Sequence, residues 1–242
     1  MKKYTALLIA IFAPTALLSA ADLSLSAGGG GLLGYTFTRY TLEGGNITST
    51  QNMDRINYGG WLFFDATLWE LTVMFQGGSN SYAEKMDYGA NTLSNSAGKG
   101  SEASLGVSLL GKYPFRINEK ICWFPLLGVE YQIALIEKRQ PEGGAMYNRA
   151  KSYYPEDNDK NGKHYPLSAW NSWWIDIGAG LDYTITDSLF LRSELIFGFR
   201  LRTDYEKGAL EVVQQQTGIK DPKLTGLTGG PALKIAAGWR FL

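Results

Sequence analysis

Charged side chains near residue 200 are separated by even numbers of positions. Arg192, Glu194, Arg200 and Arg202 fall on one face of an extended chain, because successive side chains of a β-strand point to opposite sides. The other face is apolar and holds Leu189, Leu191, Leu195, Phe197, Phe199 and Leu201. This alternation predicts a strand that gathers ionisable groups on one side, where they form ion pairs or line a path for ions.

Taken together with this strand, the polar faces of the alternating stretches hold acids and bases in equal number. The acids are Asp65, Glu70, Glu130, Asp176, Asp182 and Glu194, and the bases are Lys112, Arg192, Arg200, Arg202, Lys234 and Arg240. If this face lines a narrow interior, the charges should pair, because an unpaired buried charge is costly. Two interpretations stay open, a structural network that plugs the interior and a gate in a narrow pore. The same face also carries apolar residues that either pack the interior or line a route for small apolar molecules, namely Trp61, Phe63, Trp174, Phe190 and Ile196.

One histidine is a candidate for acid–base chemistry. His164 lies near Asp157, Asp159 and Ser168 in a polar segment without a regular pattern. A catalytic histidine needs partners that hold it in place, and a turn-rich segment offers no rigid support. We therefore assign no catalytic residues and expect no enzymatic activity and no cofactor.

The same segment contains a weak calcium candidate. Asp157, Asp159 and Asn161 place oxygen atoms at alternate positions before Gly162, as in the first half of a calcium-binding loop. The twelfth position is Ser168, so the bidentate glutamate of an EF-hand is missing. Richness in Asn, Asp and Gly is also what any turn-dense loop shows.

The elements that position these groups form eight alternating stretches. We expect strands at about 23–40, 56–65, 68–76, 102–113, 123–136, 227–242 and, as a hairpin, on either side of residues 186–188 within 168–202. Gly28 to Gly31 interrupt the first stretch without shifting its phase, so we place the strand through them. The segments 42–55, 77–99, 137–167 and 203–225 are predicted as long loops, the last with a short helix at 206–215, and the remaining connections are short.

The start of the chain predicts export. Lys2 and Lys3 precede an apolar run that ends in small residues, which is the order of a secretory signal. We expect residues 1–21 to be removed after Ala20 or Ala21, leaving residues 22–242 as one domain. Cys122 is the only cysteine, so an internal disulfide is excluded. The formal charge is balanced, which gives no sign of a nucleic-acid partner.

Volume and aromatic spacing decide which face points outward. An eight-stranded barrel has an interior just wide enough for side chains, and the apolar face is too bulky to fit it. Trp173 and Tyr183 share that face, ten residues apart, which matches an apolar band of about 25 Å between two aromatic girdles. The predicted girdle residues are Tyr35, Phe37, Trp69, Tyr113, Trp173, Tyr183, Trp239 and Phe241. The sequence therefore predicts an all-β, antiparallel, up-and-down transmembrane barrel with long outer loops and short periplasmic turns.

The whole mature chain resembles the small eight-stranded bacterial outer-membrane barrels of the OmpA, OmpX and OmpW type. The resemblance rests on the signal sequence, the rhythm of strands and loops, and a closing strand in which Gly238 precedes Trp239 and Phe241. It implies an outer-membrane location and contact with membrane lipid. It also implies recognition of the last strand by the assembly machinery, although Leu242 stands where an aromatic residue usually ends the chain. Two functions are expected, a narrow passive channel for small solutes and a structural or adhesin-type barrel whose loops 137–167 and 203–225 bind an extracellular ligand.

Overall fold

The computed structural model of the chain describes residues 24–141, 147–148, 171–201 and 222–241. Their regular structure is entirely β. The strands are β1 (Leu25–Gly44), β2 (Ile47–Ala66), β3 (Trp69–Tyr88), β4 (Asn91–Lys112), β5 (Phe115–Arg116), β6 (Ile121–Pro141), β7 (Tyr147–Asn148), β8 (Ser172–Thr184), β9 (Leu189–Arg200) and β10 (Lys223–Arg240). A search of these residues finds no helix long and apolar enough to cross a membrane.

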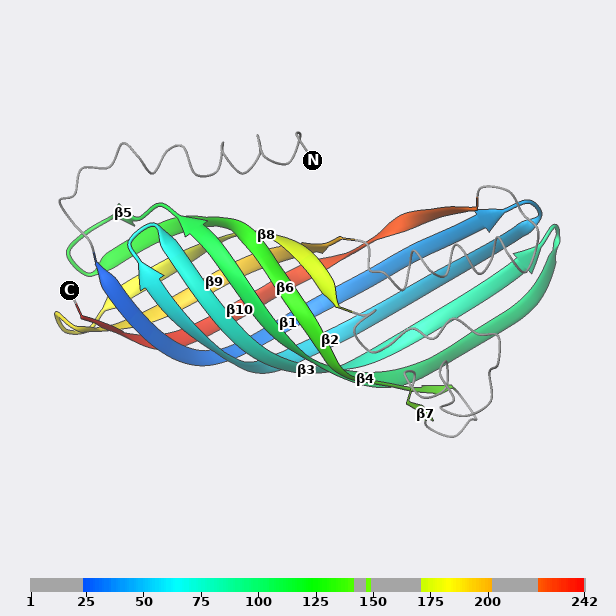
Figure 1. Ribbon diagram of the computed structural model, residues 1–242, viewed down its shortest axis with the longest axis horizontal. Helices are drawn as coiled ribbons and strands as arrows, with labels where there is room; N and C mark the ends of the chain where they lie inside the picture. The colour runs from blue at the N-terminus through cyan, green and yellow to red at the C-terminus, as the bar shows by residue number, and fades with distance from the viewer. Residues whose placement is uncertain (1–23, 142–146, 149–170, 202–221, 242) are drawn as a thin grey trace.

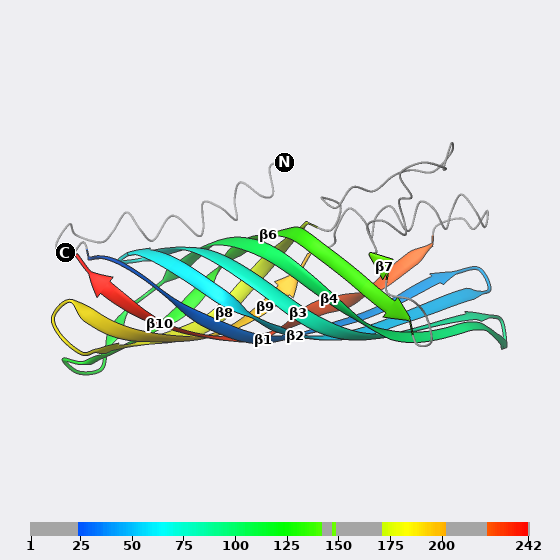
Figure 2. The ribbon, with the colours of Figure 1, turned by 90° about the horizontal axis from the view of Figure 1, so that it is seen from below.

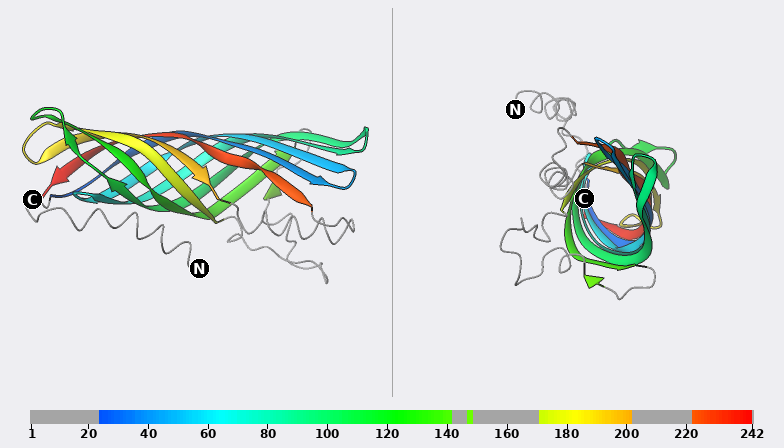
Figure 3. Two further views of the ribbon diagram at one scale, coloured as in Figure 1. Left: turned by 90° about the horizontal axis from the view of Figure 1, so that it is seen from above. Right: turned by 90° about the vertical axis from the view of Figure 1, so that its right-hand side faces the viewer.

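Eight of the strands close into a ring. They follow the order β4-β3-β2-β1-β10-β9-β8-β6, and pairing of β4 with β6 closes the sheet on itself. All neighbours are antiparallel, and Figure 3 shows the ring from one end. The short β5 and β7 each pair with β6. The predicted eight-stranded up-and-down barrel is confirmed.

The ring has two unlike ends. β1 begins where β10 ends, and at that end β2–β3, β8–β9 and β5–β6 are joined by short turns (Figure 1). At the other end β1 to β4 and β10 run on well beyond β8 and β9 (Figures 1 and 2). The barrel therefore continues on one side as a sheet that rises past the rest of the wall.

The prediction of loops at 42–55 and 77–99 is wrong. Both segments belong to strands that stay paired up to two-residue turns, with one register shift at Met86/Asp87, and Gly45 and Gly89 adopt φ values of 57° and 58° in these turns. Glycine enters this left-handed region without steric cost, which makes such turns possible. Likewise, β10 begins at Lys223 rather than at Leu227. The reason is that a strand surrounded by water needs no apolar face, so its sequence shows no alternation.

Along most of each strand, successive side chains alternate between the wall's two sides. On β2, Trp61 and Phe63 are 2% and 3% exposed, whereas Leu62 and Phe64 are 64% and 47% exposed. The predicted register of this strand, which its doubly apolar centre left ambiguous, is thus confirmed. So is the strand through Gly28 to Gly31, which pairs with β2 and β10. Large apolar side chains cover the outside of the wall, and the ionisable groups face inward.

Several predictions concern residues outside the described part of the chain. These are the signal peptide at 1–21, His164, the calcium candidate at Asp157, Asp159 and Asn161, Arg202, and the helix at 206–215. The loop predicted at 137–167 is described at 137–141, which completes β6, and at 147–148, which forms β7.

Candidate functional site

Arg192 on β9 lies at the centre of an ion-pair cluster that crosses the lumen. Its guanidinium donates two hydrogen bonds of 2.7 Å to Asp182, one of 2.6 Å to Glu70 and one of 2.8 Å to Asp65. Lys112 donates to the same Asp65 oxygen. We call Asp65, Glu70, Lys112, Asp182 and Arg192 the Arg192 cluster. Its members come from five different strands, so one buried guanidinium ties together most of the circumference.

Three phenylalanine rings surround the same guanidinium. The Arg192 Cζ lies 4.4 Å from the ring centroid of Phe63, 5.0 Å from that of Phe124 and 5.2 Å from that of Phe190. Lys112 lies 4.6 Å from the Phe124 centroid. The negative face of an aromatic ring attracts a cation, and the attraction grows when water is excluded. The rings therefore stabilise the charge and fill the lumen around it.

Each ring has a glycine directly beside it on the neighbouring strand. Phe63 pairs with Gly28, Phe124 with Gly180, and Phe190 with Gly238. A Cβ added at Gly180 or Gly238 would overlap the ring. These glycines therefore leave room in the interior for bulky side chains of the adjacent strands.

Replacing one of these glycines should destabilise the packing of the lumen. We expect Gly238→Ala to lower the free energy of unfolding by about 1–3 kcal/mol, because the Phe190 ring must move out of a packed site. Urea unfolding in lipid vesicles, followed by tryptophan fluorescence, measures this. Gly31→Ala is the matched control, since its Cβ would have only Gly59 O as a neighbour, at 3.9 Å. Equal losses in the two variants would contradict the role of the glycine.

The cluster gathers only part of the predicted charge set. Glu194 lies 4.0 Å from Arg192, while Glu130, Asp176 and Lys234 lie further along the lumen. Arg240 lies at the end of the barrel where β1 begins and β10 ends, and it donates a 3.1 Å hydrogen bond to Thr184. Arg200 is near the opposite end and donates to Tyr40 at 3.2 Å. The charges are therefore unequally distributed along the described lumen, and acids predominate in its middle.

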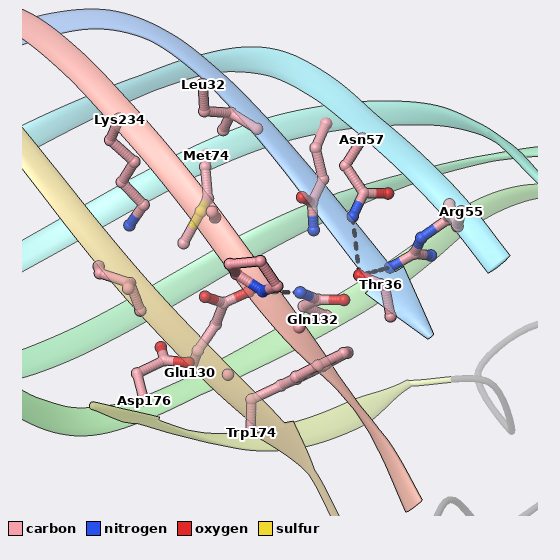
Figure 4. A pocket seen from close by; sticks show the side chains of 16 residues that line it. Leu32, Thr36, Arg55, Asn57, Met74, Glu130, Gln132, Trp174, Asp176 and Lys234 are labelled. Atoms are coloured by element: carbon pink, nitrogen blue, oxygen red, sulfur yellow. Dashed lines mark hydrogen bonds between the residues drawn. The ribbon is translucent and has the colours of Figure 1, made fainter. Parts of the chain in front are cut away.

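A cavity occupies the lumen between the Arg192 cluster and the end with the extended strands. We call it the outer cavity. Figure 4 shows Glu130, Asp176 and Lys234 at one side of it, and Arg55, Asn57 and Thr36 at the other. Apolar side chains complete its wall, chiefly Leu32, Met74, Trp174 and Ile196. The predicted interior apolar residues Trp61, Phe63 and Phe190 pack around the charges, which supports the packing interpretation for these three.

Sequence reasoning missed two lumen residues, Arg55 and Phe124. Arg55 lay in a predicted loop, yet it faces inward and forms a 2.6 Å ion pair with Glu102. Arg55 lies two positions before Asn57, so both side chains fall on the same face of an extended strand. This spacing is the signal that could have identified Arg55 as a lumen residue. Phe124 went unassigned because the stretch from Cys122 to Leu127 is apolar at nearly every position.

Aromatic side chains mark both margins of the outer face. Tyr113, Tyr183, Trp239 and Phe241 are exposed near the end of the barrel where β1 begins, and Tyr35 and Trp173 are exposed at the opposite margin. Trp69 and Phe37 are half-buried members of the two groups. Trp123 joins the first group and stacks on Phe115 at 4.9 Å between ring centroids. Their assignment to two membrane girdles stays a prediction.

Charged side chains occur on the outer face again just beyond the aromatic margin at Tyr35 and Trp173. Asp54 lies opposite Phe37 and accepts hydrogen bonds of 2.6 Å from both Tyr35 and Arg39. The Tyr35 hydrogen bond, followed by the bond and charge of Arg39, holds the pKa of the Asp54 carboxyl below its usual value. The ion pair thus sits at the boundary where an apolar surface gives way to water.

Comparisons with known proteins give similar solved structures but no family. No family model and no curated protein matches the chain. It is similar to the attachment invasion locus protein Ail of Yersinia pestis, with 13% identity, a TM-score of 0.33 and coverage of 90% of this chain and 99% of that one. It is also similar to the outer membrane protein OprG of Pseudomonas aeruginosa, with 13% identity, a TM-score of 0.46 and coverage of 91% and 96%. Neisserial surface protein A shows 12% identity, a TM-score of 0.33 and coverage of 88% and 97%.

The class of protein follows from the wall itself. Where the ring is closed it leaves no unpaired strand edge, its outside is apolar between two aromatic margins, and its inside is charged and packed. A soluble barrel has the opposite arrangement. The chain is a small eight-stranded transmembrane β-barrel.

Proposed function

We propose that this chain is an outer-membrane barrel with a closed lumen that acts at its outer end. The observation that carries the proposal is the Arg192 cluster. Arg192 and Glu70 are 1% and 0% exposed, and the rings of Phe63, Phe124 and Phe190 leave no gap beside them. Since an eight-stranded barrel has little free bore, such a cluster makes a plug rather than a selectivity filter.

The outer end supplies the surface that would act. The paired extensions of β1 to β4 and β10 project beyond the aromatic margin at Tyr35 and Trp173 (Figure 2). A rigid, hydrogen-bonded sheet can present a binding surface without the entropy cost of ordering a loop. We propose that extracellular ligands contact these hairpins as well as the segments 137–167 and 203–225. No catalytic step is part of the proposal, since the central ionisable groups are bound to one another.

An outer-membrane location of the barrel also implies its other partners. The apolar outer face would contact outer-membrane lipid. The assembly machinery would recognise β10 and the exposed aromatic residues Trp239 and Phe241 near its end. This recognition would follow export and removal of residues 1–21. The side with the short turns would then face the periplasm.

A narrow channel for small solutes is the second candidate. The outer cavity favours it, because a polar space already reaches from the outer side toward the middle of the lumen. Passage would require the Arg192 cluster to separate, which exposes several buried charges at once. The cluster would then be a gate.

Conductance in planar bilayers distinguishes the two candidates. For a closed barrel we expect no unitary current steps from the refolded protein in concentrated potassium chloride. Arg192→Lys is the informative variant, because it keeps the charge but loses the planar fork that holds three carboxylates. Arg200→Ala, at the outer end, is the control. Regular steps in the wild type that change with Arg192 would overturn the plug and establish the gate.

A further inference from the structure

Two pairs of carboxyl groups lie in direct contact inside the lumen. In the first pair, Glu130 on β6 and Asp176 on β8 are hydrogen-bonded to each other, and Figure 4 shows them side by side at the outer cavity. In the second pair, Glu194 on β9 is hydrogen-bonded to Glu70 on β3. The four residues are between 0% and 6% exposed. Because a carboxylate can only accept, a hydrogen bond between two carboxyl groups requires a proton on one of them.

The second pair shows which of its members carries the proton. Glu70 accepts a 2.6 Å hydrogen bond from Arg192 at Oε2, whereas its Oε1 receives no N–H or O–H donor from the described residues. The same holds for both oxygens of Glu194, and its Oε1 lies 4.0 Å from the Arg192 Nε. The other charged groups that face this pair are Asp65 on β2, Lys112 on β4 and Lys234 on β10. The donor pattern therefore indicates that Glu194 is neutral and donates to Glu70.

The first pair is polarised in the same way. Gln132 donates a 2.6 Å hydrogen bond to Glu130, and the positive charges of Lys234 on β10 and Arg55 on β2 also act on this carboxyl group. The charged groups that act on Asp176 are Glu130 and Lys234. Glu130 thus has the donor that a carboxylate needs, which leaves Asp176 as the member that donates.

The charges of the described lumen also favour bound protons. Between Arg240 at one end and Arg200 at the other, seven acids face four bases when Glu102 is counted with its partner Arg55. The acids are Asp65, Glu70, Glu102, Glu130, Asp176, Asp182 and Glu194, and the bases are Arg55, Lys112, Arg192 and Lys234. Two neighbouring carboxyl groups in a medium of low dielectric do not both ionise, because like charges repel strongly there. One proton in each pair removes the negative charges that lie closest to one another.

We propose that the closed lumen binds two protons, one shared by Asp176 and Glu130 and one by Glu194 and Glu70, and that their release to water at alkaline pH loosens the barrel interior. The two protons are then part of the folded structure. This inference goes beyond the proposed closed barrel, because the protons are bound whether the lumen stays shut or opens as a gate.

The second proton is coupled to the Arg192 cluster. Arg192 Nε donates to Asp182 at 2.7 Å and lies 4.0 Å from Glu194 Oε1. When Glu194 loses its proton, it repels Glu70 and competes with Asp182 for this N–H group. Release of the proton therefore weakens the contacts that fill the middle of the lumen.

Infrared spectroscopy of the full barrel tests directly for the protons. A protonated carboxyl group has a C=O stretching band that a carboxylate lacks, and vesicles of ether-linked lipid contribute no ester carbonyl in that region. At about pH 6 ordinary carboxyl groups are ionised, so we expect the remaining bands to come from the two pairs and to disappear toward about pH 9. Asp176→Asn should remove one band and Glu194→Gln the other. A wild-type barrel without such a band at about pH 6 would refute the proposal, and this measurement needs no variant.

The stability of the barrel should depend on pH with the corresponding sign. The unfolded chain releases these protons above about pH 5, whereas the folded barrel keeps them, so the folding equilibrium constant should fall as the pH rises. The expected fall is up to about tenfold per pH unit for each proton still bound, and it ends once the folded barrel has released both. Urea unfolding in the same vesicles between about pH 6 and about pH 9 measures it.

Amide variants separate the bound protons from other effects of pH. Asp176→Asn and Glu194→Gln keep the shape of the side chain and supply an N–H donor to the partner carboxylate, so they imitate the protonated forms. Each should reduce the pH dependence and be more stable than the wild type at about pH 9. Asp54→Asn removes an exposed acid that is paired with Arg39 and should leave the pH dependence unchanged. A double variant, Asp176→Asn with Glu194→Gln, that keeps the pH dependence of the wild type would overturn the assignment of the protons.

Discussion

Arg192→Met should lower the free energy of unfolding of the barrel by about 3–5 kcal/mol. The substitution removes the guanidinium and leaves Glu70 and Asp182 buried without their cation, while Asp65 retains only Lys112. The loss therefore arises mainly from stranded carboxylates rather than from one missing bond. Urea unfolding in phospholipid vesicles, with tryptophan fluorescence and heat-dependent gel mobility as readouts, measures the change.

The exposed Arg39–Asp54 pair provides a matched control for this prediction. Its nitrogen and oxygen lie 2.6 Å apart, as do those of Arg192 and Glu70, but its side chains are 44% and 39% exposed instead of 1% and 0%. Exposed pairs contribute at most about 1 kcal/mol, so Arg39→Met should have a small effect. Adding Glu70→Gln and Asp182→Asn to Arg192→Met should recover part of the loss, because the stranded charges disappear. Similar losses for Arg39→Met and Arg192→Met would show that burial does not set the strength of the cluster.

The membrane-spanning wall could be predicted from the sequence because each strand there faces two different media. Leu195 must meet lipid and Glu194 must not, so a shift by one residue exchanges a favourable face for a costly one. This energetic asymmetry appears in the sequence as alternation of polar and apolar residues. It determines the register even of β2, where Trp61 and Leu62 are both apolar.

The extended hairpins could not be predicted for the opposite reason. Residues such as Asn52 and Ser81 lie on paired strands, but beyond the membrane both sides of the sheet meet water or polar groups. Nothing then penalises a polar residue on either side, and a polar strand cannot be distinguished from a loop by pattern alone. The backbone pairing that holds these hairpins depends on turns at Gly45 and Gly89, a local signal that glycine-rich loops share.

The lumen was predicted in composition and less well in arrangement. Period two places Glu70, Asp182 and Arg192 inside, but their convergence depends on how far each strand is staggered against the next. The same stagger brings Phe190 beside Gly238 and carries Arg200 and Arg240 to opposite ends. The equal numbers of acids and bases in the sequence therefore do not predict that acids outnumber bases around Asp176.

Ile177→Arg should lower the free energy of unfolding in vesicles by about 2–4 kcal/mol. Ile177 lies on the outer face of β8, between the aromatic residues Trp173 and Tyr183, and is 54% exposed in the isolated chain. That exposure is stable only if hydrocarbon surrounds it, and a guanidinium near the middle of the bilayer loses its hydration there. Ile185→Arg is the control, because Ile185 is comparably exposed but lies past Tyr183, where the cost falls to about 0–1 kcal/mol. The difference between the two variants, measured by urea unfolding, reports depth in the membrane. Equal effects at both positions would mean that this face does not span the bilayer, and the apolar belt would need another partner.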